Sequence, residues 1–309
     1  MSKHHLSNNR SKAYALLLIN TILWGLSPPI IKVALNFVTT NQFLLGRYLL
    51  ASLIFLPLYF IFQNKGIKKL RQGNWPLLIF LALLGTPLTL IPLYEGLRLT
   101  SSIEASILTA TGPLLVILGG RIFLKEKISR NEEVGLIIAI FGTLLLAFEP
   151  IFNNGSGIKF SLIGNLLILG SNLIWTAFLL LVKKLKTDAS QISLVSYLVS
   201  IPVFALLVFF TPVSVVARTN IAAPLALMGI VYMAIFGSVI AFWAYTKGQE
   251  YIKAGEAAIF TYLQPLITFP LAYFWLGETL SGSSLLACLL IATGVYFSEY
   301  HGKSKSAII

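Results

Sequence analysis

A long stretch of this chain occurs twice. Residues 99–147 align without a gap with residues 251–299 when they are moved by 152 positions. The matches include residue types that rarely coincide by chance, and they pair Glu104 with Glu256, Pro113 with Pro265, Glu126 with Glu278 and Gly142 with Gly294. An internal duplication predicts two units of the same fold, so a functional site is expected between two related halves.

The apolar residues occur in runs of about 20, which is long enough to cross the hydrocarbon core of a bilayer as helices. The 309 residues are 57% hydrophobic and 11% charged, and their mean hydropathy is +0.84. We therefore expect an all-α integral membrane protein. Ten runs predict ten transmembrane helices, at residues 13–34, 41–62, 76–98, 102–124, 131–149, 160–183, 191–211, 224–247, 254–276 and 281–299.

Lysine and arginine gather in alternate connections between these runs. Clusters follow the second, fourth and sixth runs, at residues 65–71, 125–130 and 183–186. Cytoplasmic loops carry the excess of positive charge, so both termini are expected in the cytoplasm. The net charge of +12 is thus explained by topology, and nucleic acid is not an expected partner.

An odd number of helices in each half makes the second half enter the membrane from the opposite side. The halves are then inverted five-helix repeats, related by a pseudo-two-fold axis in the membrane plane. The predicted organisation is an amino-terminal tail (1–12), a first repeat (13–149), a linker (150–159), a second repeat (160–300) and a carboxy-terminal tail (301–309). Both tails are expected in the cytoplasm.

Several short motifs recur in order along both halves. They are the W-G-x6-K of Trp24, Gly25 and Lys32, then Arg47, the Y-x-x-L-R-x-T-S-S-I-x-A-S-I of residues 94–107, and Pro113 and Glu126, followed in the second half by Pro265, Gly277, Glu278 and Gly294. In this order they resemble the EamA family of the drug/metabolite transporter superfamily. One departure is Lys125, which stands where the second repeat has Gly277.

The resemblance implies a transporter of small organic solutes, often an exporter, that works by alternating access. It also implies a central cavity lined mainly by helices one to four and six to nine, with helices five and ten standing aside. We expect export of amino acids or related metabolites. The alternatives are an exchanger of phosphate-bearing metabolites or nucleotide sugars, with Lys32, Arg47 or Lys183 binding the anion, and drug efflux.

Polar and aromatic residues within the apolar runs are the candidates for the substrate cavity. Pro113 and Pro265 are expected to kink two equivalent helices near the midplane, although a kink can also serve packing alone. The candidate cavity residues are Trp24, Tyr94, Thr109, Thr111, Trp175, Trp243, Tyr262 and Gln264. Alternatively, the threonines bond to their own preceding turn and the tryptophans pack between helices.

Few charges lie within the predicted helices, and ionisable residues there are functional candidates. Lys32, Arg47 and Glu95 are expected near the outer side, where Arg47 and Glu95 would form an ion pair that acts as a gate. The family resemblance favours a structural or gating role for Lys32 and Arg47, because members with different substrates carry basic residues there. No carboxylate is placed at the midplane, which leaves proton coupling open.

The sequence contains few of the residue patterns that are typical of an enzyme. The three histidines lie in the tails, Cys288 is the single cysteine, and no phosphate-binding glycine loop is present. No enzyme activity, cofactor or metal is expected. The expected partners are a small-molecule solute and the lipid bilayer of a plasma membrane, in a bacterium by resemblance, with a homodimer as an open alternative.

Overall fold

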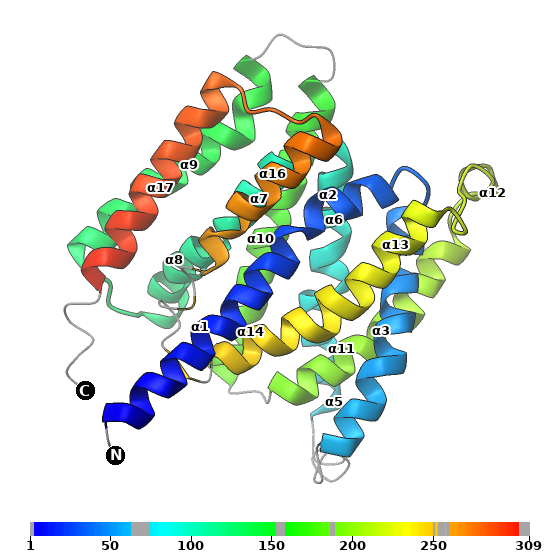
Figure 1. The fold of residues 1–309 in the computed structure, drawn as a ribbon, viewed down its shortest axis with the longest axis horizontal. Coiled ribbons are helices and arrows are strands. Elements are labelled where there is room, and N and C mark those ends of the chain that lie inside the picture. The colour runs from blue at the N-terminus through cyan, green and yellow to red at the C-terminus, as the bar shows by residue number, and fades with distance from the viewer. Residues whose placement is uncertain are drawn as a thin grey trace.

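The protein is a bundle of α-helices in the computed structural model, which describes residues 3–62, 74–152, 158–185, 189–249, 251–252, 257 and 260–302 (Figure 1). No β-strand occurs in these residues. Eight of their helical segments are long and apolar enough to cross a membrane, and a shorter apolar helix covers Gly282–Ser298. The chain is thus an all-helical membrane protein, while the count of ten crossings stays a prediction. Glu256 and the predicted linker residues 153–157 lie outside the described residues.

The first half of the chain forms α1 (Lys3–Gly25), α2 (Ser27–Ala34), α3 (Thr40–Phe62), α5 (Trp75–Gly85), α6 (Pro87–Leu99), α7 (Ser102–Ala110), α8 (Gly112–Leu124) and α9 (Arg130–Phe152). Three spans in this half are each divided in two, at Leu26, Thr86 and Thr111. A proline stands in the first turn of each following helix. Its missing N–H group is tolerated there, but it cannot continue the preceding helix, so the sequence itself places the breaks.

The second half forms α10 (Ile158–Leu185), α11 (Ala189–Phe209), α12 (Val213–Val216), α13 (Pro224–Tyr232), the π-helix η1 (Met233–Ile240), α14 (Ala241–Gln249), α16 (Gln264–Leu276) and α17 (Gly282–Gly302). The break before α16 falls at Leu263, which corresponds to Thr111 at the 152-residue offset. Two spans differ from their counterparts. Leu26 divides α1 from α2, whereas α10 continues without a break through the equivalent Ala177. Thr86 divides α5 from α6, whereas the equivalent Ser238 lies inside the π-helix η1. Single π-helical turns are frequent at functional sites.

The ends of α8 and α16 repeat one another in detail. Lys125 and Gly277 both have left-handed backbone, with φ of 56° and 66°. The N–H groups of Glu126 and Glu278 each donate to the carbonyl six residues earlier, at 3.1 and 3.2 Å. Lys125 therefore forms the same turn as Gly277, although it adopts a backbone conformation that glycine would adopt with less strain.

Small residues bring α9 and α17 into close contact along one edge of the bundle (Figure 1). A Cβ atom built on Gly142 would lie 2.8 Å from Leu290 Cβ and 2.9 Å from the backbone nitrogen of Ile291. Glycine is thus required for the two backbones to approach this closely. This pair corresponds to the fifth and tenth predicted helices.

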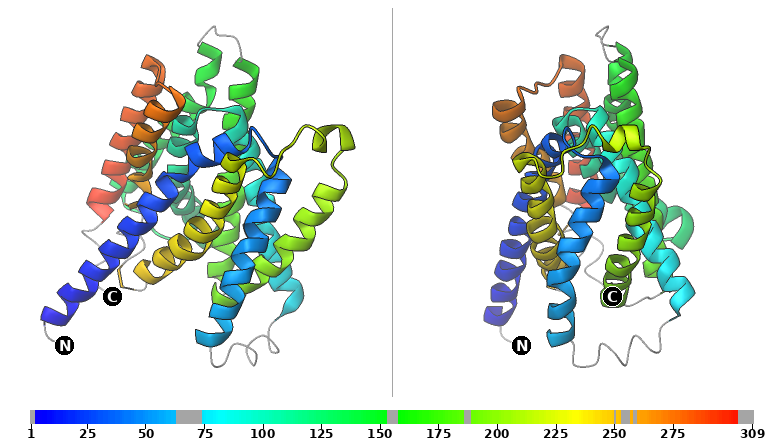
Figure 2. Two further views of the ribbon diagram at one scale, coloured as in Figure 1. Left: turned by 45° about the vertical axis from the view of Figure 1, so that its right-hand side comes forward. Right: turned by 90° about the vertical axis from the view of Figure 1, so that its right-hand side faces the viewer.

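The helices are arranged differently at the two ends of the bundle. The chain begins α1 and ends α17 at the same end (Figure 1). At that end the start of α1 and the end of α3 lie apart in both views of Figure 2. At the opposite end, α2 packs against α6, α7 and α16. At this end α2 therefore joins helices of both halves.

Candidate functional site

An ion pair links three parts of the chain at the end of the bundle where α2 and α16 finish. Lys32 Nζ lies 3.0 Å from Glu278 Oε1, and their side chains are 28% and 10% exposed. The other carboxylate oxygen of Glu278 accepts a hydrogen bond of 3.1 Å from the N–H of Ile103. Lys32 Nζ also donates to the carbonyl of Thr100. The Lys32–Glu278 pair thus ties α2 and the end of α16 to the turn between α6 and α7.

A polar cluster of three side chains adjoins this pair. The Thr100 hydroxyl lies 2.7 Å from Glu104 Oε2 and 2.6 Å from Asn165 Oδ1, and its single proton can be donated to one of them at a time. Asn165 Nδ2 donates to Glu104 Oε2 at 3.3 Å. Because Asn165 belongs to α10, these contacts join the second half of the chain to α7. They add to the contacts that the Lys32–Glu278 pair makes at this end of the bundle.

The opposite end of the bundle carries the equivalent ion pair. Lys183 Nζ lies 2.6 Å from Glu126 Oε1, and the side chains are 65% and 43% exposed. Lys183 corresponds to Lys32 at an offset of 151 residues, and Glu126 to Glu278 at 152. In Figure 1, α8 and α16 end toward opposite ends of the bundle. The repeat therefore places one ion pair at each end, and the Lys32–Glu278 pair is the more buried.

The predicted ion pair of Arg47 with Glu95 is wrong. Glu95 Oε2 instead lies 2.8 Å from Arg98 Nη2, one helical turn along α6. Consecutive helical residues point about 100° apart, so when Tyr94 faces the bundle interior its neighbour Glu95 turns toward the surface. Tyr94 is 2% exposed, whereas the side chain of Glu95 is 32% exposed.

Arg47 is buried among neutral groups contributed by α3, α6 and η1. Its Nε donates to Ser238 Oγ at 2.8 Å, and its Nη1 donates to the Tyr94 hydroxyl at 2.5 Å. The guanidinium carbon lies 5.4 Å from the ring centre of Tyr48 and 5.9 Å from that of Tyr94, within the range of cation–π attraction. No carboxylate among the described residues pairs with Arg47.

A fourth helix completes the surroundings of Arg47. The Tyr197 hydroxyl on α11 donates to the carbonyl of Ser238 at 2.9 Å, and its ring stacks on Phe55 at 4.4 Å. Sequence reasoning missed Tyr48, Tyr197 and Ser238 as neighbours of Arg47. Tyr48 directly follows Arg47 in the sequence, and this was the one available signal. Tyr197 and Ser238 are brought close to Arg47 only by the tertiary fold.

The carbonyls released at the helix breaks are bound by side chains from other helices. Asn172 Nδ2 donates to the carbonyl of Leu108 at 2.8 Å, and the Thr21 hydroxyl donates to that of Phe260 at 2.9 Å. Leu108 and Phe260 are equivalent at the 152-residue offset. Each donor comes from the opposite half of the chain, so these breaks serve as contacts between the halves.

Two of the predicted cavity residues lie where α1 crosses α16 and α14. Trp24 Nε1 donates to the carbonyl of Gly237 at 3.0 Å, and its ring centre lies 5.3 Å from that of Tyr245. Gln264 is 7% exposed, and its Nε2 has no hydrogen-bond partner among the described residues. Both side chains are held at a contact between the two halves of the chain.

Of the four other candidates within the bundle, three make contacts within their own helix and one packs in an apolar cluster. The hydroxyls of Thr109 and Thr111 donate to carbonyls of their own preceding turn, at 2.7 and 2.6 Å. Trp175 packs against Phe178 of the same helix, with ring centres 5.0 Å apart. Tyr262 is partly buried and packs against an apolar cluster centred on Leu114, Leu136 and Ala139.

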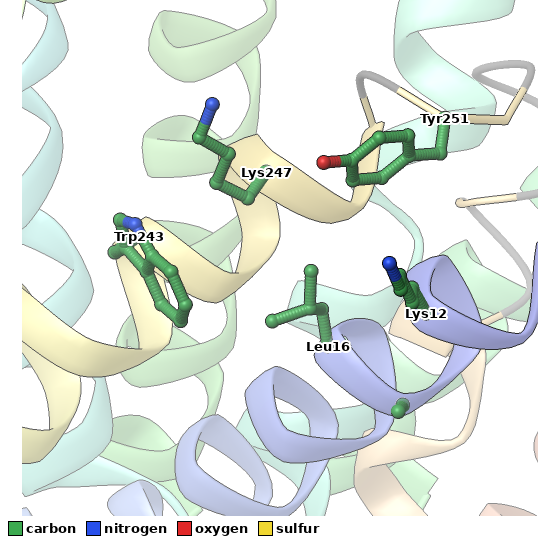
Figure 3. A pocket seen from close by; sticks show the side chains of 6 residues that line it. Lys12, Leu16, Trp243, Lys247 and Tyr251 are labelled. Carbon is green, nitrogen blue, oxygen red and sulfur yellow. The ribbon is translucent and has the colours of Figure 1, made fainter. Parts of the chain in front are cut away.

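Trp243 lies elsewhere. It is 55% exposed and lines a groove of about 440 Å³ between α1 and α14. Figure 3 shows Trp243 and Lys247 across this groove from Leu16 and Lys12. The structure therefore joins Tyr94 to Arg47, places Trp24 and Gln264 near one helix crossing, and leaves Trp243 apart.

Comparisons with known proteins point to one class. The sequence profile of the EamA-like transporter family matches residues 11–148 and 162–300. The chain is 26% identical over 308 residues to the uncharacterized transporter YyaM of Bacillus subtilis (strain 168), covering 96% of this chain and 98% of that protein. It is 27% identical over 267 residues to the uncharacterized transporter YetK of the same organism, covering 84% and 78%.

A solved crystal structure supports the fold. It superposes with a TM-score of 0.58 over 97% of this chain and 99% of the other, at 18% sequence identity. At this identity the likeness concerns the arrangement of the helices alone. The match along both chains shows that the described helices follow an arrangement already seen by experiment.

Proposed function

Because the chain belongs to the EamA-like transporter family, we propose that it exports small organic metabolites, amino acids or related compounds, by alternating access. The observation that carries the mechanism is the duplicated ion pair, Lys32–Glu278 at one end of the bundle and Lys183–Glu126 at the other. In this proposal ten helices cross the plasma membrane and both termini are cytoplasmic. The Lys32–Glu278 pair then faces the outside.

The two ion pairs act as gates that open in turn. Separating a largely buried pair leaves two poorly solvated charges and is costly, whereas an exposed pair contributes only about 0–1 kcal/mol. The Lys32–Glu278 pair is the more buried, and the polar cluster of Thr100, Glu104 and Asn165 reinforces it. In the proposed orientation the described state is closed toward the outside, with a weaker barrier toward the cytoplasm. A solute would enter from the cytoplasm, as export requires.

Profiling the growth medium tests this function. The protein is overexpressed in a bacterium, and metabolites that accumulate outside the cells are measured by mass spectrometry. Cells with the empty vector and cells expressing Lys32→Glu serve as controls. Export of a metabolite that depends on the intact protein supports the proposal. An unchanged medium together with increased resistance to toxic compounds would favour drug efflux instead.

Purified protein distinguishes a transporter from a channel. Solute uptake into proteoliposomes should saturate and should be competed by a related solute, because one site is exposed to one side at a time. Single-channel currents in a planar bilayer would contradict alternating access.

A further inference from the structure

The groove between α1 and α14 combines two lysines with two aromatic residues. The residues that line it are Lys12, Ala15 and Leu16 of α1, Trp243 and Lys247 of α14, and Tyr251 (Figure 3). None of these six described residues is acidic. The groove therefore presents positive charge from both halves of the chain beside apolar and aromatic surface.

The two helices of the groove cross at a glycine, and the other half of the chain repeats this crossing between α6 and α10. A Cβ atom built on Gly248 would lie 2.7 Å from Leu17 Cγ, and one built on Gly96 would lie 2.7 Å from Ile168 Cγ1. Gly248 corresponds to Gly96 at an offset of 152 residues, and Leu17 corresponds to Ile168 at 151. Close helix packing thus explains the glycine in both halves.

The lysines of the groove are not repeated. Ile163 stands at the position equivalent to Lys12, and Glu95 at the position equivalent to Lys247. Since the same crossing forms without them, packing does not require the two lysines. Membrane topology favours positive charge at this end of the bundle, but it does not require lysines of two separate helices to line one groove. A binding role accounts for both their charge and their common position.

The groove lies near the level at which lipid headgroups meet the hydrocarbon core. Lys12 is two residues after the start of the apolar span Arg10–Ala34, and Lys247 is two residues before the end of the span Pro224–Gln249. Tryptophan and tyrosine are enriched at this level of a membrane, because their rings are apolar and carry a polar group. The composition of the groove thus matches the headgroup region.

Positive charge predominates in the sequence on both sides of the groove. Residues 10–12 and 247–253 together carry four basic residues and one acidic residue, Glu250, which lies outside the described residues. One carboxylate cannot balance four cations, so the region attracts anions. Basic pockets between transmembrane helices are suited to the phosphate groups of lipids.

An apolar surface continues from the groove along α1. Ile19 and Ile22 follow Leu16 at intervals of three residues, and both are exposed. A soluble anion would contact only the charged part of this surface, whereas a lipid would use both parts. We propose that the groove binds an anionic phospholipid, with its phosphate between Lys12 and Lys247 and an acyl chain along α1. This binding goes beyond the proposed transport, and only its assignment to the cytoplasmic leaflet uses the proposed orientation.

Native mass spectrometry of the full-length protein tests this binding. The protein in mild detergent is offered equal amounts of phosphatidylglycerol and phosphatidylcholine with the same acyl chains, and phosphatidylglycerol should be retained preferentially. Because each lysine adds a similar attraction, its affinity should fall about fivefold in Lys12→Gln or Lys247→Gln and about 30-fold in the double variant. Lys184→Gln is the matched control. It removes an exposed lysine next to Lys183, at the same end of the bundle, and should bind as the wild type does.

Tryptophan fluorescence locates the bound lipid. Brominated acyl chains quench the indoles that they contact, and Trp243 is 55% exposed in the groove. Brominated phosphatidylglycerol should therefore quench more than brominated phosphatidylcholine at the same mole fraction. Trp243→Phe should remove this excess quenching. Trp75→Phe, at a tryptophan that is 40% exposed elsewhere, should keep it.

Four outcomes overturn the proposal. Equal affinity for the two lipids excludes recognition of charge, and a preference that survives in the double lysine variant places the lipid elsewhere. Displacement of the lipid by an equal concentration of inorganic phosphate would indicate a site for soluble anions. A lipid-free dimer that dissociates in the double variant would assign the groove to a second copy of the chain.

The quenching measurement stands on its own if the lysine variants fail to fold, because it needs only the two tryptophan variants. Excess quenching that persists in Trp243→Phe contradicts the proposal. None of these measurements requires a transported solute, so a failure of lipid binding is distinguishable from a failure of the proposed function.

Discussion

At the scale of single residues, the clearest difference between the two repeats is at the turn after α8 and α16. Lys125 and Gly277 share a left-handed backbone, although a lysine there is strained by its Cβ. A Cβ built on Gly277 would meet no atom within 4 Å, so only backbone strain opposes a side chain there. The two positions therefore form an internal comparison of the same turn with and without strain.

Exchanging residue types at this turn should shift stability in opposite directions. Lys125→Gly is expected to raise the free energy of unfolding and Gly277→Ala to lower it, each by about 1 kcal/mol. Thermal unfolding of the purified protein in detergent measures both. A lower midpoint for Lys125→Gly would mean that the lysine side chain contributes more than its backbone conformation costs.

Single residues also show where sequence reasoning reaches its limit. It identified Lys32 and Arg47 as candidates for a structural or gating role, because an ionisable residue in an apolar run stands out. It paired Arg47 with Glu95 wrongly, since neighbouring residues on a helix face different directions and only packing decides which one faces inward. The contacts of Tyr197 and Ser238 with Arg47 join residues far apart in sequence, and no local pattern announces them.

At the scale of helices, prolines and glycines place the main features. The prolines at the starts of α2, α6, α8 and α16 coincide with breaks in four spans, and the kinks expected at Pro113 and Pro265 fall at two of these breaks. The π-helix η1 could not be foreseen, because no proline stands in it. Within it, the Ser238 hydroxyl donates to the carbonyl of Met233, five residues earlier, and accepts from Arg47 Nε.

The contact of α9 with α17 should be sensitive to one added methyl group. Gly142→Ala is expected to lower the free energy of unfolding by about 1–3 kcal/mol, because the new Cβ would meet backbone atoms that cannot rotate away. Gly170→Ala is the matched control in α10, where a Cβ would meet nothing within 4 Å. Thermal unfolding compares the two variants, and equal midpoints would contradict the packing described for Gly142.

At the scale of the whole molecule, the duplication produces equivalent contacts at opposite ends. The ion pairs follow the repeat, as do the breaks before α8 and α16 and the turns after these two helices. The surroundings of Arg47 do not follow it. The ion pairs proposed to open and close are thus duplicated, whereas the contacts of Arg47 with Ser238 and Tyr94 occur once.

Exchanging the charges of the outer pair tests its role as a gate. Lys32→Glu should abolish most transport, because it places two carboxylates side by side at the closed end. The double variant Lys32→Glu with Glu278→Lys restores opposite charges and should recover part of the activity. Solute efflux from proteoliposomes measures both. Normal transport by Lys32→Glu alone, at wild-type protein levels, would exclude this ion pair as a gate.

The unequal exposure of the two ion pairs has a consequence for how the protein responds to its medium. Dissolved salt weakens ion pairs between exposed charges and acts much less on buried ones. Salt should therefore loosen the Lys183–Glu126 pair and leave the Lys32–Glu278 pair almost intact. In the proposed orientation, the ionic strength of the cytoplasm would then favour a resting state that is open toward the cell interior, before any solute has bound.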